Sequence, residues 1–279
     1  MQCRSFIASS TISGNALLSR QPRIISDNDT FRASYDQLVK GDLILGRLRM
    51  RPSEESLLLD LTERGVRLFP SALSQSACRS KAFQALLFSS YMLPCTKAVH
   101  DQHQLLKIMN DYQDLGIDRI VTKEDRRNAG MGVYLWQSIE DLHTQAGLGV
   151  VPYPFVLQPF FPNCYDIRVI ILGDYLEAYT RHNQHNFRNN LHCGGSSEPC
   201  GLTHEQRELC RNVMARGKFP YAHIDLMVTA DNKTYLGEIN LRGGIRGAKI
   251  RPAEYKDRVE ALHAGARINA EGNKGAENL

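Results

Sequence analysis

The amino-acid sequence predicts an α+β protein, because two kinds of pattern follow one another along the chain. In the first half, short apolar segments alternate with segments of helical spacing, and two apolar–polar hairpins follow from residue 166 onward. With 279 residues, the chain is long enough for one large domain or for two to three small units that share a core.

Composition excludes several classes of protein. Apolar residues make up 42% of the chain and charged residues 23%, which is ordinary for a globular protein and excludes wholesale disorder. The 34 basic and 30 acidic residues leave a net charge of +4, which requires neither a nucleic-acid nor a membrane partner. Residues 150–161 form the most apolar stretch, which is too short to span a membrane and is interrupted by three prolines.

Cysteine usage and the N-terminal residues bear on location. The seven cysteines are odd in number, widely spaced and without a CxxC motif, which argues against a disulfide framework and predicts the reducing cytoplasm. Arg4, Arg20 and Arg23 lie among serines, with no acidic residue before Asp27, as in some organelle-targeting segments. Because no long amphipathic helix accompanies them, a strand over residues 4–9 followed by a loop is favoured instead.

The first 75 residues predict a small α/β domain. Residues 42–47 and 66–69 are apolar and short, as expected of buried strands. Between them the pattern indicates a helix, with Pro52 at its first position and Gly65 just past its end.

The middle of the chain continues the alternation. A helix is expected over residues 76–93, where Pro94 stops it. After it we expect, in order, strand 95–99, helix 102–112, strand 119–123, strand 133–136 and helix 138–146. At the other end of the chain, residues 265–279 are small and polar and predict a flexible tail.

The first of the two hairpins joins strands 167–172 and 175–181 through Gly173 and Asp174. A two-residue loop fixes the register, so that the numbers of paired residues sum to 347 and Asp166 lies opposite Arg181. One face is apolar, whereas the other carries Asp166, Arg168, Glu177, Tyr179 and Arg181. The residues alone leave open whether this polar face is a solvated surface with ion pairs or part of a functional site.

The second hairpin joins strands 223–229 and 234–240. A four-residue loop pairs residue 229 with residue 234, so that paired numbers sum to 463 and Asp225 lies opposite Glu238, with Asn240 on the same face. Like charges directly opposite on paired strands repel each other. Two carboxylates and an amide oxygen are ligands for a hard cation such as Mg²⁺, although carboxylates that diverge on a solvated face would explain the pattern as well.

Two loops have features of anion sites. Lys123 precedes a loop over residues 124–132, in which Gly130 and Gly132 allow backbone N–H groups to surround phosphate oxygens. The loop is neither a Walker A loop nor the GxGxxG of a dinucleotide fold. Residues 186–195 form a second loop, rich in hydrogen-bond donors. A zinc site is disfavoured, because no standard zinc spacing is found among His192, Cys193, Cys200, His204 and Cys210.

Taken in order, these motifs resemble those of the ATP-grasp superfamily, and within it the RimK-type glutamate ligases. The motifs are Lys81, Lys123 with its glycine loop, Leu157-Gln-Pro-Phe160, Asp166-Ile-Arg168, residues 187–195, Asp225 and Glu238-Ile-Asn240. The resemblance covers residues 42–249 and implies an ATP cleft between two α+β subdomains. It implies this division: 1–75 small α/β domain, 76–155 central subdomain, 156–264 C-terminal subdomain with the metal site, and 265–279 tail.

The same resemblance implies roles for individual residues. The nucleotide would be held by Lys81 and Lys123 at the phosphates, Gln158, Pro159 and Phe160 at adenine, Asp166 near the ribose, and Arg188, Asn189 and Asn190. Arg168, Arg181 and Asn190 would act in catalysis, the two arginines at the γ-phosphate and the acyl phosphate. Asp225, Glu238 and Asn240 would bind Mg²⁺ or Mn²⁺, with Glu238 bridging two ions.

The sequence departs from the family pattern in three places. Pro159 removes a backbone donor at the adenine hinge, Cys193 replaces an arginine, and residues 241–244 replace the usual Ser-Pro-Gly. The last segment brings in Arg242 and Arg246, which suggests that one substrate is acidic. The alternatives are a solvated basic turn, or arginines that pair with Glu254 and Asp257 just downstream.

The implied activity is ATP-dependent ligation of a carboxylate to an amine through an acyl phosphate, on an amino-acid, peptide or protein substrate. The altered loops keep open a catalytically degenerate ATP-binding module. An RNA-binding scaffold is disfavoured, since no base-stacking motif is present. We expect neither a membrane nor a nucleic-acid partner, and a homo-oligomer is compatible with the sequence.

Overall fold

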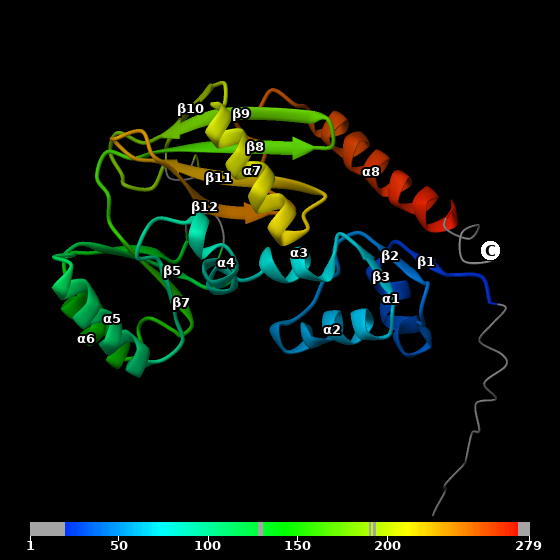
Figure 1. Ribbon diagram of the computed structural model, residues 1–279, viewed down its shortest axis with the longest axis horizontal. Helices are drawn as coiled ribbons and strands as arrows, with labels where there is room; N and C mark the ends of the chain where they lie inside the picture. Colours follow the sequence, from blue (N-terminus) through cyan, green and yellow to red (C-terminus); the bar gives the residue numbers. More distant parts are fainter. Residues whose placement is uncertain (1–19, 128–130, 190, 192–193, 273–279) are drawn as a thin grey trace, which may run out of the picture.

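The computed structural model describes residues 20–127, 131–189, 191 and 194–272, and within these ranges it contains three β-sheets. Figure 1 shows the N-terminal sheet at one end of an elongated molecule, and the four- and five-stranded sheets one above the other at the opposite end. Each sheet has its own apolar core. In the described part of the chain, no helix has both the length and the apolar character needed to cross a membrane.

The N-terminal unit is the expected small α/β domain. Its three strands are parallel in the order β1-β2-β3, and they are β1 (Ile24–Ile25), β2 (Leu43–Leu45) and β3 (Arg67–Phe69). The helices between the strands are α1 (Asn28–Ser34) and α2 (Ser56–Glu63). Gly65 follows α2 with a φ of +74°, as its predicted place just past a helix end requires. The strand expected over residues 4–9 lies outside the described residues.

The prediction of a single helix over residues 76–93 is wrong. The structure has α3 (Ala72–Ala77), α4 (Lys81–Leu87) and a short 3₁₀ turn (Ser89–Tyr91). Ser80 separates the two helices, because its backbone is extended and its side chain accepts a hydrogen bond from the N–H of Phe83 at 3.0 Å. Serine favours such capping positions over helix interiors, and the apolar spacing alone did not reveal the interruption.

The central sheet has the order β4-β7-β5-β6 and is antiparallel throughout. Its strands are β4 (Lys97–Val99), β5 (Ile120–Glu124), β6 (Val133–Trp136) and β7 (Phe155–Pro159), and its helices are α5 (Gln102–Asp114) and α6 (Ile139–Gly147). Both helices lie together on the side of this sheet that faces away from the five-stranded sheet (Figure 1). The sheet continues to Pro159 and so passes the subdomain boundary expected at residue 155.

The C-terminal sheet has the order β10-β9-β8-β11-β12. Its strands are β8 (Tyr165–Leu172), β9 (Tyr175–His182), β10 (Ser196–Pro199), β11 (Tyr221–Val228) and β12 (Thr234–Asn240); α7 (His204–Gly217) and α8 (Pro252–Gly272) complete this part. The register predicted for the first hairpin is confirmed, since Leu172 pairs with Tyr175 and Asp166 with Arg181.

The second hairpin has a different register at its loop. Thr234 pairs with Val228 instead of residue 229, and a bulge between Asp225 and Leu226 restores the predicted pairing of Asp225 with Glu238. Gly237 is the extra residue of β12 at this bulge, and a Cβ there would lie 3.1 Å from the carbonyl oxygen of Asp225. Glycine therefore permits the close strand approach that the bulge requires.

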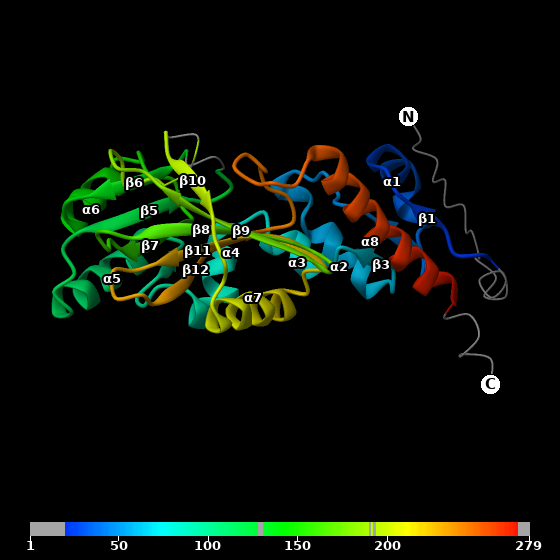
Figure 2. The ribbon, with the colours of Figure 1, turned by 90° about the horizontal axis from the view of Figure 1, so that it is seen from above.

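The flexible tail predicted from Gly265 is wrong over residues 265–272, because α8 continues through Gly265 to Gly272. Residues 273–279 lie outside the described part. Figure 2 shows α8 running from the C-terminal sheet past the N-terminal sheet, and the helix contacts both β8 and β2. The apolar residues of α8 that pack against the core of the C-terminal sheet are Tyr255, Val259 and Leu262. They precede Gly265, so residues 265–272 extend a helix that is already formed and packed, and extending a helix costs less than starting one.

Candidate active site

One face of the C-terminal sheet brings the predicted charged residues together. Arg168 of β8 pairs with Asp225 of β11, and Asp225 pairs with Glu238 of β12, so these three side chains form one row across the sheet. Two positions along β8, Asp166 pairs with Arg181 of β9. Arg181 is only 6% exposed, and the others are partly buried. This face is therefore partly buried and carries ion pairs.

Asp225 forms ion pairs with two arginines. Its Oδ1 atom lies 2.7 Å from Arg168 Nε and 3.0 Å from Arg181 Nη2. Burial would raise the pKa of the Asp225 carboxyl, but the two guanidinium groups outweigh burial and hold this pKa below its usual value. Arg181 Nη2 also lies 3.5 Å from Asp166 Oδ2. For Asp166 burial prevails over Arg181, and its pKa is raised.

Two lysines from the facing elements complete this cluster. Lys81, the first residue of α4, places its Nζ 3.4 Å from Glu238 Oε1 and donates a hydrogen bond to the carbonyl oxygen of Arg127. Lys123 lies on β5 of the central sheet; burial lowers the pKa of its ammonium group, and the charge of Glu238 opposes this shift. A pocket between the two sheets is lined by Lys81, Gln84, Met92, Lys123, Val156, Gln158 and Gly237.

The predicted metal ligands form a set of hard oxygen donors. Asp225 and Glu238 lie directly opposite each other, and Asn240 follows Glu238 by two positions, opposite His223. Among the residues that the structure describes, no three His, Cys, Asp or Glu side chains gather into a metal cluster. Asp225 Oδ1 is buried and makes no aligned hydrogen bond. Two carboxylates and an amide fit Mg²⁺, which takes only a few protein ligands when phosphates supply others.

The segment expected to contact adenine lacks the free backbone donors that the family resemblance implies. Gln158 is 8% exposed and lines the pocket, as expected. Pro159 has no N–H group, and the N–H of Phe160 donates to the carbonyl oxygen of Arg119 at 2.9 Å. The Cζ atom of Arg119 lies over the Phe160 ring, 4.5 Å from the ring centroid. Neither Pro159 nor Phe160 therefore offers a free backbone donor.

The loop after β9 connects the two sheets. Arg188 Nε donates to the carbonyl oxygen of Val133 on β6 at 3.0 Å, and its guanidinium stacks 4.3 Å from the centroid of Phe187. Asn189 Nδ2 donates to Asp166 Oδ1 at 3.4 Å. Asn189 thus joins the charged cluster, whereas Arg188 binds backbone of the central sheet. Asn190, like residues 128–130 and 192–193, lies outside the described residues.

The segment after Asn240 passes directly over the charged row. A Cβ at Gly243 would lie 2.6 Å from Arg168 Nη1 and 2.7 Å from His223 Nδ1, so no other residue fits there without displacement. Arg242 and Arg246 are exposed and make no ion pair with any described residue. The alternative in which they pair with acidic residues of α8 fails at Glu254, which pairs with Arg258 at 3.0 Å.

Sequence reasoning missed a buried histidine beside the predicted ligands. His223 is fully buried, its Nε2 lies 3.0 Å from the Tyr255 hydroxyl, and burial together with Arg168 lowers its pKa to about 4. The hairpin register had placed His223 opposite Asn240, which is a usable signal. Tyr255 lies 32 residues further along the chain on α8, and no local pattern predicts that contact.

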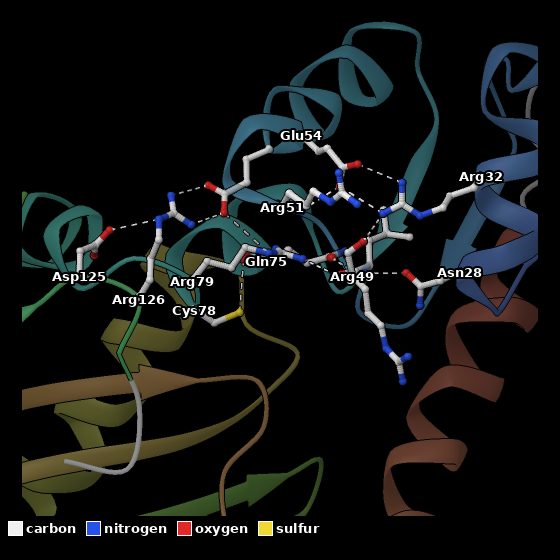
Figure 3. Close-up of polar contacts among 12 residues, drawn as sticks. Asn28, Arg32, Arg49, Arg51, Glu54, Gln75, Cys78, Arg79, Asp125 and Arg126 are labelled. Atoms are coloured by element: carbon white, nitrogen blue, oxygen red, sulfur yellow. Dashed lines mark hydrogen bonds and ion pairs between the residues drawn. The ribbon is translucent and has the colours of Figure 1, made fainter. Parts of the chain in front are cut away.

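The N-terminal unit also contacts the loop that follows Lys123. Arg126, three residues after Lys123, binds Glu55 through both carboxylate oxygens, at 2.5 and 3.0 Å. Arg79 lies beside this pair and donates to the backbone oxygens of Leu48 and Gln75 (Figure 3). This network connects α2, the α3–α4 junction and the loop after β5, so the N-terminal unit borders the site.

Residues 77–253 match the family model described as the RimK-like ATP-grasp domain. The match covers more than half of the chain, so the chain belongs to the RimK-like ATP-grasp family.

Two curated relatives agree with this family. A probable alpha-L-glutamate ligase 2 of Shewanella amazonensis is 26% identical over 209 residues, which cover 71% of this chain and 68% of the relative. N-acetylaspartylglutamate synthase A of Mus musculus is 25% identical over 198 residues, which cover 69% of this chain and 52% of the relative. The chain thus spans about half the length of the mouse enzyme.

Solved structures show the same fold. The D-cycloserine synthetase DcsG superposes with a TM-score of 0.57 at 15% identity, covering 79% of this chain and 84% of DcsG. The D-alanine-D-alanine ligase from Coxiella burnetii gives a TM-score of 0.58 at 11% identity, covering 84% and 71%. The predicted ATP-grasp α+β fold is confirmed. With the family match, the chain is an ATP-dependent ligase that joins a carboxylate to an amine, as the sequence predicted.

Proposed function

We propose that this ligase uses ATP and Mg²⁺ to join an acidic amino acid or peptide to its second substrate. The observation that supports the proposal is the charged row Arg168–Asp225–Glu238, which faces Lys81 and Lys123. Such a cluster of cations and oxygen ligands suits the transfer of a phosphoryl group, in which the protein mainly positions the reactants and neutralises charge.

In the proposed reaction, a carboxylate oxygen of the first substrate attacks the γ-phosphorus of ATP, and ADP leaves. The amine of the second substrate then attacks the carbonyl carbon of the acyl phosphate. Phosphate leaves, the amine loses a proton, and an amide remains. No protein nucleophile is needed, so the cysteines have no role in this chemistry.

The nucleotide would contact both sheets. We assign Lys81 and Lys123 to the phosphates, because both interact with the charge of Glu238 and line the same pocket. Gln158, Pro159 and Phe160 would border adenine, with Asp166 and Asn189 near the ribose and Arg188 and Asn190 at the nucleotide. Since Phe160 N–H is already bonded, we expect adenine to be held mainly by side-chain and ring contacts in this segment.

Arg168 and Arg181 would neutralise the transferred phosphoryl group and the acyl phosphate, with Asn190 beside them. Both form ion pairs with Asp225, which holds their guanidinium groups at the site. Asp225, Glu238 and Asn240 would hold two Mg²⁺ or Mn²⁺ ions, with Glu238 between them. The ions, when bound, neutralise charge on the phosphate oxygens.

An acidic substrate is proposed from the segment after the metal ligands. Arg242 and Arg246 are exposed, make no ion pair with described residues and flank Gly243, which lies against Arg168. A guanidinium fork binds a carboxylate through two parallel hydrogen bonds. The names of both curated relatives refer to glutamate, which supports the same choice. Structural neighbours solved with precursor peptides support a peptide as one possible substrate.

Cellular context is proposed from the sequence alone. The cysteine pattern favours the cytoplasm. The small net charge favours neither a nucleic-acid nor a membrane partner, and a homo-oligomer is compatible with it.

The proposal is tested by following products and oxygen atoms together. The purified protein is incubated with ATP, Mg²⁺ and glutamate or aspartate whose carboxylate oxygens carry ¹⁸O, together with a set of amino acids and short peptides. Mass spectrometry should detect a new amide and ¹⁸O in the released phosphate, because the acyl phosphate transfers one carboxylate oxygen. ADP and phosphate without any amide, or nucleotide binding without turnover, would instead identify a degenerate ATP-binding module.

A further inference from the structure

The outer edge of β12 is held by a side chain instead of a strand. Gln84 of α4 accepts a hydrogen bond from the N–H of Ile239 at 2.9 Å and donates one to the carbonyl oxygen of the same residue at 2.9 Å. A third bond joins Gln84 Nε2 to the carbonyl oxygen of Ala77 at 2.9 Å. The amide is 1% exposed, and both of its ends are occupied.

The need for such a contact follows from the position of β12 at the end of the sheet order. The outward N–H and C=O groups of an edge strand lack partners, and leaving them buried without hydrogen bonds is costly. Leu236 meets Met92 in a parallel bridge further along the same edge. At Ile239 the side-chain amide of Gln84 replaces the missing peptide group, since it offers the same donor and acceptor.

Ile239 is the residue between two proposed metal ligands. Glu238 precedes it and Asn240 follows it, and their side chains point to the face opposite that of Ile239. The two hydrogen bonds from Gln84 restrain the peptide units on both sides of Ile239. Lys81, which lies 3.4 Å from Glu238, begins the same helix. One short helix therefore determines both the position of a phosphate-binding cation and the backbone of the ligand strand.

We propose that Gln84 is a positioning residue that fixes the separation of Glu238 and Asn240, so that both can bind the same divalent cation. This role rests on the proposed function, because it needs the cation at those ligands. Gln84 itself cannot reach a cation without breaking its three hydrogen bonds. Residues that hold ligands in this indirect way typically contribute about 10- to 100-fold to metal affinity.

The chain offers a matched control in Gln75. This glutamine is also fully buried, accepts a hydrogen bond from Leu48 N–H at 2.9 Å, and donates to the carbonyl oxygen of Pro70 at 2.9 Å. It lies on α3 and bonds to the backbone at Leu48 and Pro70, in the network drawn in Figure 3, away from the bonds that Gln84 makes to β12. Gln84→Leu thus removes three buried hydrogen bonds to backbone, and Gln75→Leu removes two at a different place.

The experiment measures Mn²⁺ binding to the full chain with ADP present, by electron paramagnetic resonance. Gln84→Leu should weaken Mn²⁺ binding by about 10-fold or more, whereas Gln75→Leu should stay within about 2-fold of the wild type. Both variants should lose thermal stability, so a fall in stability alone does not separate them. Faster amide hydrogen exchange at Ile239 in the Gln84 variant would verify that its bond is lost.

Two other results overturn the role of Gln84. Equal Mn²⁺ affinity in Gln84→Leu and the wild type, with Ile239 exchanging faster, means that the amide only stabilises the fold. Equal weakening of Mn²⁺ binding in both variants means that a general loss of rigidity of the fold is responsible. If Gln84→Leu does not fold, Gln84→Met, closer in shape, replaces it under the same criteria. The variant Asp225→Asn/Glu238→Gln should bind no Mn²⁺ in the presence of ADP. If the wild type binds none either, the proposed function itself is rejected.

Discussion

The two hairpins of the C-terminal sheet have the same topology but opposite charge. The β8–β9 hairpin contributes the arginines Arg168 and Arg181, and the β11–β12 hairpin contributes the acids Asp225 and Glu238. The opposite charges meet where β8 pairs with β11. The β11–β12 hairpin alone would place two carboxylates opposite each other, and the arginines of the β8–β9 hairpin balance them once both hairpins are assembled.

The hairpins also differ in regularity. A two-residue turn keeps the first in one register from end to end. The second contains a bulge at Gly237, next to Glu238. Bulges change the direction of neighbouring side chains and are frequent beside active sites. The regular hairpin thus provides a stable frame, whereas the irregular one shapes the proposed ligand site.

The largest expected effect comes from removing the charges of the second hairpin. Asp225→Asn combined with Glu238→Gln should abolish Mg²⁺-dependent ATP turnover, since both carboxylates of the proposed metal site become neutral amides. Phosphate release with varied Mg²⁺ measures this effect. Asp231→Asn, in the exposed loop of the same hairpin, is the control and should turn over ATP as the wild type does. Turnover retained in the double variant would remove the metal from these residues.

The stability of Asp225→Asn, one of the two substitutions in that double variant, distinguishes two expectations. Opposed carboxylates considered alone would make the double variant more stable. In the structure, however, Asp225 neutralises both Arg168 and Arg181, which are left without this partner when it becomes Asn. We therefore expect Asp225→Asn to lose roughly 1–3 kcal/mol of unfolding free energy, less than for a fully buried pair. Denaturant melts without metal measure it, and a gain in stability would contradict the role of the arginines.

The next effect tests the central sheet as the partner of both hairpins. Lys123→Ala should weaken ATP binding about 10-fold or more but AMP binding much less, because the ammonium group is assigned to the β- and γ-phosphates. Calorimetry with both nucleotides measures the difference. Lys97→Ala, at an exposed position of β4 in the same sheet, controls for the loss of one positive charge. Equal losses for ATP and AMP would place Lys123 outside the phosphate site.

Much of this site was predictable because hairpin register is local information. The pairing of Asp166 with Arg181 followed from a two-residue turn. Asp225 opposite Glu238 was predicted correctly, but from a loop pairing that is wrong at Thr234; the bulge at Gly237 compensated for the error. No pattern in the sequence marked that bulge, since one glycine in a strand fits several structures.

What the sequence did not reveal depends on contacts distant along the chain. Gln84 binds Ile239 across 155 positions, and His223 binds Tyr255 across 32. Such contacts are set by tertiary packing, not by periodicity. Two local features were also missed. The break before α4 was missed because apolar spacing was given more weight than the cap at Ser80, and the continuation of α8 past Gly265 because composition was given more weight than the extension of an existing helix.

A smaller effect concerns the substrate beside the second hairpin. Arg246→Lys should raise the KM of the acidic substrate several-fold and leave the KM of ATP unchanged, because lysine cannot reproduce the two parallel hydrogen bonds of a guanidinium fork. Steady-state kinetics with each substrate varied in turn measures this. Arg251→Lys, exposed and just beyond this segment, is the control. If Arg242→Ala and Arg246→Ala both leave every KM unchanged, the segment is a solvated turn.

The smallest effect concerns how α8 holds each hairpin. The first hairpin is held by charge, because Arg258 lies 3.2 Å from the exposed Asp174. The second is held by neutral groups, because the Tyr221 hydroxyl lies 3.2 Å from His263 Nε2. Burial lowers the pKa of His263 below 6.5, although Glu260 opposes the shift. The unfolded chain therefore binds a proton on this residue more readily than the folded protein does.

The sign of the pH effect follows from this difference. Stability associated with a neutral His263 is complete well above pH 6.5, and it decreases as the pH falls through the unfolded pKa toward the lower folded one. His263→Gln should thus flatten the fall in unfolding free energy between about pH 7.5 and 5.5, by roughly 1 kcal/mol or less. Denaturant melts at both pH values measure it, with His182→Gln, at an exposed position of the first hairpin, as the control. An unchanged slope in His263→Gln, or an equal change in both variants, would mean that protonation of this contact does not distinguish how α8 holds the two hairpins.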